Sequence, residues 1–547
     1  MSRLAARTAV GAVALYALGC SAAFAAAAPT EQEHPGKAVY DRACAACHNN
    51  PEATRSPSLE ALKRMRFTNV HYALTEGKMK AQAAELTDAE RVAVTDFLTG
   101  ETRANDAWVE QMMCPADRRV VDLSPAPTVA GFGFDIQNHR HLTKAQAGLS
   151  TEDLANLELA WVLAFPQATT MRSQPAVVGS TLFLPVGETS QILAIDVSQR
   201  EPCLKWVYTS DLPLRTSAAY GEVAGRKVLV VGDVAANIHM VDALTGKKLW
   251  QQSVQLFPLS LTTGTPIIHG DRVYAPISQY EITVGANDDH ECCKTHGAVV
   301  ALDGKTGEKL WIAHTMEDAK PVRDRGDGKM IWGPSGAPIW NSPALDPKRG
   351  LLYVGTGEAT SEPAAKTTDA ILAIDIKDGS IHWSFQATEN DIFLSGCMGP
   401  RPATEGAPPR RQLNCPLQTV FRDVDFGASV ILAKLENGKD ALFAGQKSGT
   451  LWALDPDNGN VLWRQDFGEG SPLGGIHWGI AFDGERVYAP INRPYGFNPQ
   501  NAAVRDQKPG IHAVDAVTGK VLWTFAAEPD CSGDRRTRVR GCANNIG

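Results

Sequence analysis

From Ile192 onward, the chain repeats one pattern of apolar and polar positions. A short apolar strand ends in Asp, turn residues that usually include Gly follow, and a second strand ends in Trp. Alternating apolar residues bury one side of such a hairpin, and the Asp and Gly close its turn. The pattern occurs at Ile192–Asp196 with Trp206, Ile238–Asp242 with Trp250, Val299–Asp303 with Trp311, Ile371–Asp375 with Trp383, Leu451–Asp455 with Trp463 and Ile511–Asp515 with Trp523.

These hairpins predict a fold of stacked blades. One four-stranded sheet cannot bury both of its faces alone, so repeated sheets of this kind stack around an axis. Further strands lie between the repeats, for example Arg272–Pro276 and Gly350–Val354. A Trp at a fixed position of each unit packs against the neighbouring sheet, so we assign all six to the core rather than to a cofactor. Residues 131–547 are therefore predicted to form an all-β propeller.

The pattern changes in the first hundred residues. Leu86–Arg91 opens an amphipathic helix in which Thr87 can act as the cap, with Glu90 three residues later, and Gly100 ends it. We predict a small all-α domain over residues 33–100. Residues 101–130 show little periodicity and contain several prolines, so they are predicted to be a linker.

The N-terminus resembles an export signal. Arg3 and Arg7 precede an apolar run from Ala9 to Leu18, and alanines before Pro29 fit a cleavage site. Residues 1–28 are therefore predicted to be a signal peptide, with a lipoprotein signal at Cys20 as the alternative. The run is too short for a permanent membrane span, and no other segment is predicted to be transmembrane. The mature protein is predicted to be periplasmic.

The net charge and the cysteine content indicate which partners to exclude and which covalent bonds to expect. The chain has 547 residues and a formal net charge of -8, so no basic surface indicates a nucleic-acid partner. An even number of cysteines in an exported chain suggests disulfides once Cys20, Cys44 and Cys47 are set aside. The local pairs Cys397–Cys415 and Cys531–Cys542 are favoured and Cys114–Cys203 is what remains, although spacing alone does not settle the connectivity.

The run Cys44-Ala-Ala-Cys47-His48 predicts one covalently bound haem c. Two thiols add to the haem vinyl groups, and the adjacent imidazole of His48 reaches the iron. Met79 is the predicted second axial ligand, and Met65 is the alternative. A resemblance to class I cytochromes c favours Met79. The alternative is a redox-active Cys-x-x-Cys pair that precedes a histidine by chance.

The Asp-to-Trp repeat resembles that of the quinoprotein alcohol dehydrogenases. That family has an eight-bladed propeller and uses pyrroloquinoline quinone (PQQ) and Ca²⁺, and the resemblance covers residues 131 to 547. Because only six repeats are present, the resemblance implies that the C-terminal blades are incomplete.

Several segments between the repeats match that family in order and spacing. The resemblance implies quinone contacts at Thr263, Ser278, Trp340, Asn492 and Arg215, with Trp340 stacked on the quinone ring. It implies calcium ligands at Glu281 and Glu358. Glu358 stands where the family usually has Asn, but a carboxylate is an equally hard oxygen ligand. Arg172 is a second departure, because many relatives have a glutamate there.

The resemblance also implies a calcium-bound carboxylate that acts as the catalytic base, and a cation beside the quinone. Asp423, in Arg422-Asp-Val-Asp425, is the first choice for the base, with Asp391 in reserve and Asp425 third. Lys447 is the predicted cation that stabilises charge on the quinone oxygens.

Cys292 and Cys293 form a separate motif. Many quinoprotein dehydrogenases press a vicinal disulfide against the quinone, which would make both residues cofactor contacts. In methanol dehydrogenases the pair lies on an earlier blade, so the stacking role is open here.

A cytochrome ahead of the propeller, together with this Cys-Cys pair, is most similar to the polyvinyl-alcohol dehydrogenases that donate electrons to a cytochrome. That resemblance implies oxidation of secondary hydroxyls of a polymer to ketones, with electrons passing from PQQ to haem and then to a soluble cytochrome c. One alternative is an enzyme of the same class for small secondary alcohols or diols. Another is a non-enzymatic propeller scaffold of the outer-membrane assembly type.

Overall fold

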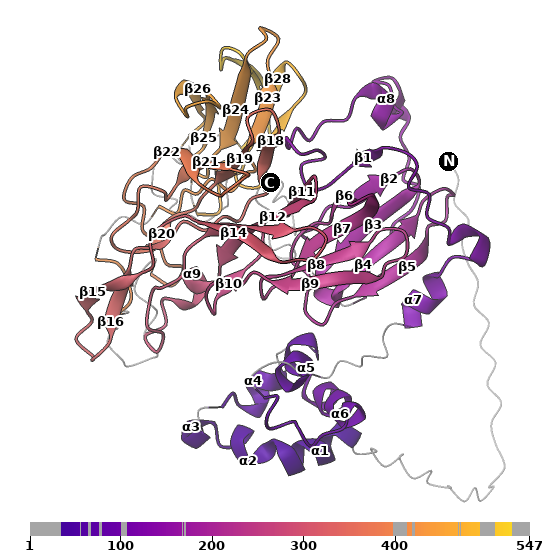
Figure 1. The fold of residues 1–547 in the computed structure, drawn as a ribbon, viewed down its shortest axis with the longest axis vertical. Helices are drawn as coiled ribbons and strands as arrows, with labels where there is room; N and C mark the ends of the chain where they lie inside the picture. The colour runs from indigo at the N-terminus through magenta and orange to yellow at the C-terminus, as the bar shows by residue number, and fades with distance from the viewer. Residues whose placement is uncertain are drawn as a thin grey trace, which may run out of the picture. The chain divides into compact units, whose positions relative to one another are not determined.

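The computed structural model divides into two compact units, Met1–Arg103 and Ala104–Gly547 (Figure 1). The structure describes residues 34–54, 56–63, 67–75, 79–99, 107–166, 168, 171–397, 413–417, 422–468, 470, 472–492 and 509–527. The predicted signal peptide, Met65, Gly100 and the Cys531–Cys542 pair lie outside these residues. No helix among the described residues is long and apolar enough to span a membrane.

The first unit is helical, as its pattern predicts. Its longest helix, α6, packs against α1 because Gly36 lets the α1 backbone approach Ala93 closely. The predicted cap is confirmed: the Glu90 backbone N–H donates to Thr87 Oγ1 at 3.2 Å, and Glu90 accepts from the Thr87 N–H at 2.9 Å. The helices are α1 (Pro35–Ala43), α2 (Ala45–His48), α3 (Pro51–Thr54), α4 (Leu59–Lys63), α5 (Phe67–Thr75) and α6 (Asp88–Thr99).

The second unit contains six antiparallel sheets of four or five strands within the described residues, and each sheet contains one repeat. The strands of the first three sheets are β1 (Pro127–Val129), β2 (Ala176–Val178), β3 (Thr181–Val186), β4 (Gln191–Asp196) and β5 (Cys203–Thr209); β6 (Ala219–Val223), β7 (Arg226–Gly232), β8 (Asn237–Asp242) and β9 (Lys248–Ser253); and β10 (Ser260–Leu261), β11 (Ile267–His269), β12 (Arg272–Gln279), β13 (Ala298–Asp303) and β14 (Lys309–His314).

The last three sheets continue the series, and Figure 1 shows β23, β24, β25 and β26 in orange. Their strands are β18 (Ala344–Asp346), β19 (Leu351–Gly355), β21 (Ala370–Asp375) and β22 (Ile381–Gln386); β23 (Ile431–Lys434), β24 (Asp440–Gly445), β25 (Thr450–Leu454) and β26 (Val461–Asp466); and β27 (Ala481–Phe482), β28 (Arg486–Ile491), β29 (Gly510–Asp515) and β30 (Val521–Ala526). Two small sheets pair β15 (Lys320–Asp324) with β16 (Met330–Gly333), and β17 (Ser335–Gly336) with β20 (Ala359–Ser361).

Five of the six repeated Trp residues pack on the next turn and join neighbouring sheets, which confirms their structural assignment; Trp523, in the last described sheet, is 47% exposed. The Trp250 indole N–H donates to the Gly304 carbonyl in the next turn at 2.8 Å, and its ring faces Gly307. A Cβ on Gly307 would lie 3.0 Å from that ring, so a side chain there would crowd it. The same pairing recurs at Trp311 with Ile376 and Gly379, at Trp383 with Pro456 and Gly459, and at Trp463 with Ala516 and Gly519.

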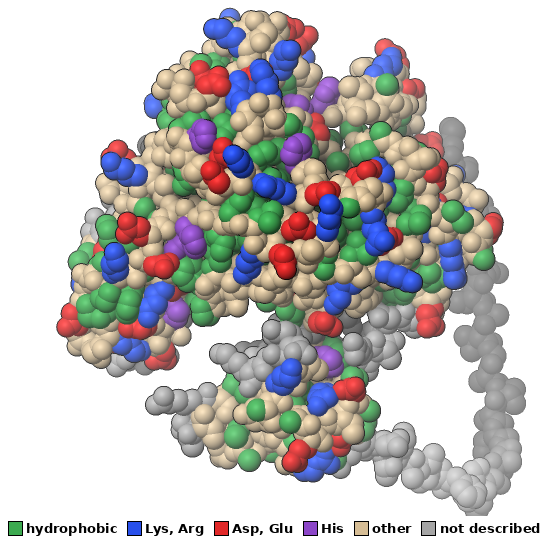
Figure 2. Space-filling model, viewed as in Figure 1, with side chains coloured by type: hydrophobic (Ala, Val, Ile, Leu, Met, Phe, Trp, Pro, Cys, Tyr) green, Lys and Arg blue, Asp and Glu red, His purple; other side chains and the backbone are tan. Residues whose placement is uncertain are grey.

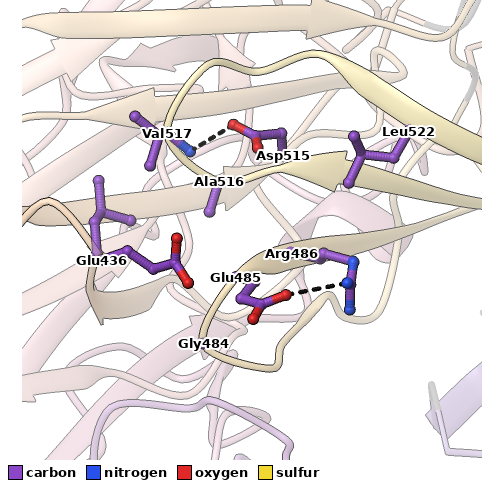
Figure 3. A pocket seen from close by; sticks show the side chains of 9 residues that line it. Glu436, Gly484, Glu485, Arg486, Asp515, Ala516, Val517 and Leu522 are labelled. Atoms are coloured by element: carbon purple, nitrogen blue, oxygen red, sulfur yellow. Dashed lines mark hydrogen bonds and ion pairs between the residues drawn. The ribbon is translucent and has the colours of Figure 1, made fainter.

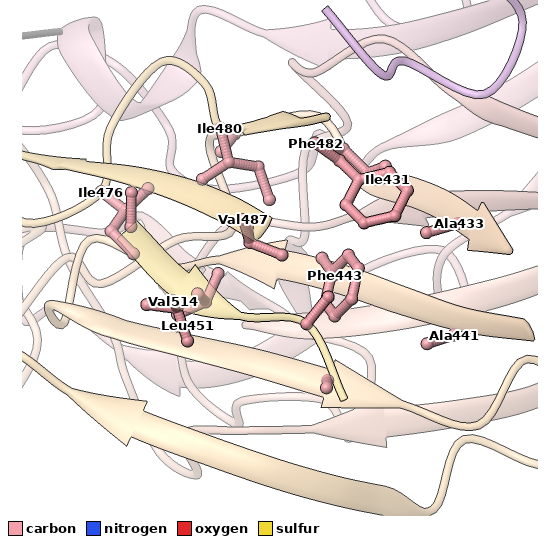
Figure 4. Close-up of a cluster of buried hydrophobic side chains, with 14 of the residues drawn as sticks. Ile431, Ala433, Ala441, Phe443, Leu451, Ile476, Ile480, Phe482, Val487 and Val514 are labelled. Atoms are coloured by element: carbon pink, nitrogen blue, oxygen red, sulfur yellow. The ribbon is translucent and has the colours of Figure 1, made fainter. Parts of the chain in front are cut away.

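Apolar side chains fill the space between consecutive sheets. In the cluster of Figure 4, Ile431 and Phe443 of one sheet meet Val487 and Val514 of the next, and all four are completely buried. Burial of this kind on both faces explains why a single blade would not be stable alone.

The segment predicted as a linker contributes structure to the second unit. Helix α7 (Ala107–Met112) packs against the first sheet, Cys114 is bonded to Cys203 at the start of β5, and β1 adds a strand at the edge of that sheet. The second unit begins near Ala104 rather than at the predicted 131, because these tertiary contacts carry no periodic signal.

The structure also tests the other disulfide predictions. Cys397–Cys415 and Cys114–Cys203 are confirmed, and Cys292 is bonded to Cys293.

Short helical segments complete the second unit, namely η2 (Ala116–Arg118), α8 (Lys144–Ala147), η3 (Asp153–Asn156), η4 (Gly187–Thr189) and α9 (Glu281–Val284). On the face shown in Figure 2, positive and negative side chains are interspersed.

Candidate active site and haem site

The residues of the haem motif lie on and beside the short helix α2. Cys44 and Cys47 are unpaired thiols, half-buried and exposed respectively. His48 Nδ1 lies 2.7 Å from the Pro57 carbonyl oxygen, and we assign the proton to Nδ1 as the donor of this hydrogen bond. That tautomer leaves Nε2 unprotonated, as an iron ligand must be. Met79 packs against the apolar core of the same unit. These residues fit a covalently bound haem, while the His48/Met79 ligand pair stays a prediction.

A buried acidic cluster lies in the propeller. Carboxylate oxygens of Glu358, Asp423 and Asp425 lie within 4.8 Å of one another. Glu358 follows β19, and the two aspartates lie in the loop that leads to β23. Lys447, just after β24, forms an ion pair with Asp423, and its Nζ lies 3.4 Å from Asp425 Oδ2. Four side chains from three sheet connections therefore converge, although nothing in their local sequence requires it.

The loop that carries the aspartates is held by Asp391. The two carboxylate oxygens of Asp391 accept hydrogen bonds from the Asp423 N–H at 3.2 Å and the Val424 N–H at 2.9 Å. Asp423 has a φ of 55°, in the left-handed region that non-glycine residues rarely adopt. Both oxygens of Asp391 are therefore engaged in fixing the backbone of its neighbour.

Burial and charge set the protonation of this cluster. Burial raises the pKa of Asp423 well above its usual range, against the attraction of Lys447. Burial also opposes ionisation of Asp425, but Lys447 and the hydrogen bond from Trp340 lower the pKa of Asp425 to about 2. Burial followed by repulsion from Asp425 raises the pKa of Glu358 well above its usual range. The attraction of Asp425 and Asp423 raises the pKa of Lys447, although burial opposes that shift.

Two carboxylates at this place have no hydrogen-bond partner. Both oxygens of Glu358 and both oxygens of Asp369 are buried and unpartnered, and each residue is 0% exposed. An isolated buried carboxylate is costly unless it is protonated or neutralised by a cation. This donor set of carboxylate oxygens fits a hard cation such as Ca²⁺. Asp369 was not predicted from the sequence, where it reads as an ordinary residue before β21.

A pocket adjoins the cluster through Trp340. The Trp340 indole N–H donates to Asp425 Oδ2 at 2.8 Å, and its ring lies 5.4 Å from that of Trp478 at an interplanar angle of 78°. Gly427 lies against the Trp340 ring, where a Cβ would clash. The pocket is lined by Phe132, Arg172, Arg215, Ser217, Thr263, Gly264, Thr265, Trp340, Asn341, Ser342, Gly427 and Trp478. Aromatic walls with cationic and hydroxyl groups fit the anionic aromatic cofactor PQQ.

Comparisons with known proteins indicate the family of the chain. Residues 132–394 match the family described as glucose/ethanol/alcohol dehydrogenase, β-propeller domain, residues 31–98 match cbb3-type cytochrome c oxidase subunit III, and residues 447–539 match outer membrane protein assembly factor BamB. The polyvinylalcohol dehydrogenase of a Pseudomonas species is 32% identical over 94% of this chain and 79% of that relative. The one from Sphingopyxis sp. strain 113P3 is 32% identical over 90% of this chain and 76% of that relative.

The chain belongs to the polyvinyl-alcohol dehydrogenase family. It is accordingly an oxidoreductase of the PQQ-dependent class with a fused cytochrome c domain. Among solved structures, a europium-containing methanol dehydrogenase shares its fold, with a TM-score of 0.54 and 18% identity over 74% of this chain and 78% of that chain. The family match to the assembly factor covers residues 447–539, whereas the two polyvinylalcohol dehydrogenases match 90% or more of the chain.

Within the polyvinyl-alcohol dehydrogenase fold, the predicted propeller residues fall into three groups: those in the acidic cluster or behind it, those that line the adjacent pocket, and those apart from both. Glu358, Asp423 and Lys447 form the acidic cluster, and Trp340, Arg215 and Thr263 line the adjacent pocket. Asn492 lies behind Lys447: its Nδ2–H donates to the Leu473 carbonyl at 2.8 Å, and its backbone pairs with Gly475, which packs against the Lys447 carbonyl.

The third group lies apart from the cluster and the pocket lining. Glu281 accepts hydrogen bonds from the Lys294 and Thr295 N–H groups at 2.8 and 2.7 Å, and its other oxygen lies 2.7 Å from His290 Nε2. Protein groups therefore occupy both of its oxygens, and the carboxylate groups with Cys292 and Cys293. Ser278 is buried in β12 opposite Leu261. The predicted roles of these four residues stay predictions.

A second hollow lies at the outer edge of the last two sheets (Figure 3). Two of its three acidic residues have local partners: Glu485 pairs with Arg486 at 3.0 Å, and Asp515 accepts from the Val517 N–H at 3.1 Å. The third, Glu436, is exposed to solvent, so the hollow lacks the buried unpartnered carboxyl groups found at the acidic cluster.

Proposed function

We propose that this protein oxidises secondary hydroxyl groups of polyvinyl alcohol to ketones in the periplasm. Electrons would pass from PQQ to haem c and then to a soluble cytochrome c. The observation that carries the proposal is the buried Lys447–carboxylate cluster beside the aromatic, cationic pocket. The two polyvinylalcohol dehydrogenase relatives support the polymer as substrate. The signal-like N-terminus supports export.

The residues of the cluster divide the work between them. Asp423 accepts the proton of the substrate hydroxyl, and the ion pair with Lys447 stabilises its ionised form. Asp391 positions Asp423 through the two backbone hydrogen bonds. When bound, PQQ supplies the acceptor for the hydride that leaves the alcohol carbon. Trp340, fixed by Asp425, forms a wall of the quinone pocket.

Glu358, Asp423 and Asp425 are the residues that would hold Ca²⁺. All three offer oxygen ligands, and Asp369 adds a further unpartnered carboxylate in the same buried region. A bound cation would favour ionisation of Glu358 and Asp423, whose pKa burial raises.

The haem provides a direct test of the function. We would reconstitute the protein anaerobically with PQQ and Ca²⁺, add polyvinyl alcohol, and follow the reduced-haem absorption band. We expect reduction only when quinone, calcium and polymer are all present. Reduction by 2-propanol or a small diol but not by the polymer would contradict the proposed substrate and favour the small-alcohol alternative. If dithionite reduces the haem and no alcohol does, the proposed function is refuted.

A further inference from the structure

The pocket beside the acidic cluster is itself cationic. Its lining contains Arg172 and Arg215, a set of hydroxyl groups and the rings of Phe132, Trp340 and Trp478, and no Asp or Glu among the described residues lines it. Aromatic walls combined with guanidinium groups favour a flat ligand that carries negative charge.

Neither arginine has an acidic partner among the described residues, and Arg172 is exposed. Several other partly buried arginines do have such a partner. Arg118 forms an ion pair with Asp196 at 2.5 Å, Arg349 with Asp346 at 2.8 Å, and Arg325 with Asp327 at 2.6 Å. Arg215, by contrast, is half-buried without such a partner. Burial, and then repulsion from Arg172, lowers the pKa of Arg215 to about 10. An anion bound in the pocket would offset this repulsion.

Hydrogen bonds hold the two arginine segments in place. The Gln174 N–H donates to Ser217 Oγ at 2.8 Å, which joins the segment of Arg172 to that of Arg215. The Arg215 N–H donates to the Gly232 carbonyl at 2.8 Å, at the end of β7. Arg172 precedes β2, so the first two sheets hold the two guanidinium groups at one pocket.

We propose that Arg172 acts with Arg215 to bind carboxylate groups of PQQ, so that Arg172 is a determinant of quinone affinity. This inference rests on the proposed function. A guanidinium group donates two parallel hydrogen bonds to a carboxylate, and PQQ carries three carboxylates on a flat ring system. Thr263 and Trp340 line the same pocket, so the rings would have an aromatic wall while the arginines hold the charged edge.

The test measures binding rather than turnover. PQQ is titrated into the cofactor-free protein in the presence of Ca²⁺, and heat is recorded by calorimetry. Replacing Arg172 with Gln should raise the dissociation constant of PQQ about 10- to 100-fold, the range expected for a lost charge-assisted hydrogen bond. Arg172→Lys should recover part of that loss, because it restores the charge without the planar fork.

Two controls separate this inference from the proposed function. Arg226→Gln removes an exposed arginine at the start of β7 and should leave the PQQ affinity unchanged. The trimethyl ester of PQQ lacks the negative charges, so wild type and Arg172→Gln should bind it equally. If Arg172→Gln binds PQQ as tightly as wild type, the inference is wrong and the proposed function stands. If wild type itself does not bind PQQ, both are refuted.

Discussion

At the scale of single residues, the acidic cluster is unusual because it gathers several buried carboxyl groups around one cation. Lys447 lies beside Asp423 and Asp425, while burial and the neighbouring carboxylates raise the pKa of Glu358 and Asp369 well above its usual range. Ionising these buried groups costs free energy, and a bound cation would lower that cost. Each carboxylate should therefore have a distinct and measurable role.

Substitution can distinguish the role of Asp423 from that of Asp391. Asp423→Asn should lower kcat by about 10²- to 10⁴-fold, because the proton acceptor is lost while the side chain keeps its shape. Haem and PQQ content should be unchanged. Asp391→Asn should lower kcat less, because its amide still offers one oxygen to the loop N–H groups. The rate of haem reduction in a single turnover measures the effect of each substitution. A null Asp391 variant beside an active Asp423 variant would reverse the assignment.

Glu358 should control cation binding. We expect Glu358→Gln to weaken Tb³⁺ binding about 10- to 100-fold, because one charged oxygen ligand becomes neutral. Tb³⁺ luminescence excited through Trp340, which contacts Asp425, reports occupancy, and Ca²⁺ competition gives the calcium affinity. Glu485→Gln is the matched control, since Glu485 is exposed and pairs with Arg486. Equal affinities in Glu358→Gln and wild type would exclude Glu358 as a ligand.

At the scale of elements, the stability of the propeller depends on the contact between each Trp and the glycine of the next turn. The ring of one sheet occupies the space that a side chain on the next turn would need. The glycine therefore serves two purposes: it allows a left-handed backbone and it leaves room for the ring.

Two glycines of equal backbone angle separate these purposes. Gly379 has a φ of 79° and an added Cβ would lie 2.6 Å from Trp311, whereas Gly225 has a φ of 78° and open space around it. Gly225→Ala should cost about 1–2 kcal/mol of unfolding free energy, the left-handed penalty alone. Gly379→Ala should cost about 1–3 kcal/mol more through overpacking. Urea unfolding followed by fluorescence checks both, and equal costs would show that the ring contact contributes nothing.

At the scale of the whole molecule, one covalent bond fixes the start of the second unit to its first sheet. Cys114 and Cys203 are separated by 89 positions, and their bond secures α7 against β5. Closing so long a loop restricts the unfolded chain strongly.

Replacing both Cys114 and Cys203 with Ser should lower the free energy of unfolding by about 2–5 kcal/mol. Replacing both, rather than one, avoids an unpaired thiol. Thermal unfolding under oxidising and reducing conditions is the measurement. Wild type should lose stability on reduction, whereas the double variant should respond less, because only its remaining disulfides can still be reduced. An unchanged melting temperature in the double variant would mean that packing alone holds α7.

The sequence by itself determined the repeating architecture and the haem motif. Each repeat consists of a hydrophobic period, a turn and a Trp, all of which are local features of the sequence. The six sheets, the docking of the Trp residues and the Thr87–Glu90 cap can therefore be predicted from neighbouring residues. Cys44, Cys47 and His48 are likewise adjacent in the chain. Resemblance to known dehydrogenases added most of the residues of the candidate site, including Asp423 and Lys447.

Only the tertiary structure decided which of those residues meet. Asp423 and Asp425 reach Glu358 across sheet connections, Glu281 is occupied by neighbouring N–H groups, and Asp391 serves the backbone instead of facing the pocket. Asp369 stands out because it is buried without a hydrogen-bond partner, and Arg172 because it lines the pocket beside Arg215, and no local pattern encodes either feature. The reason is physical: a carboxylate's environment depends on groups that loop closure brings together from far along the chain.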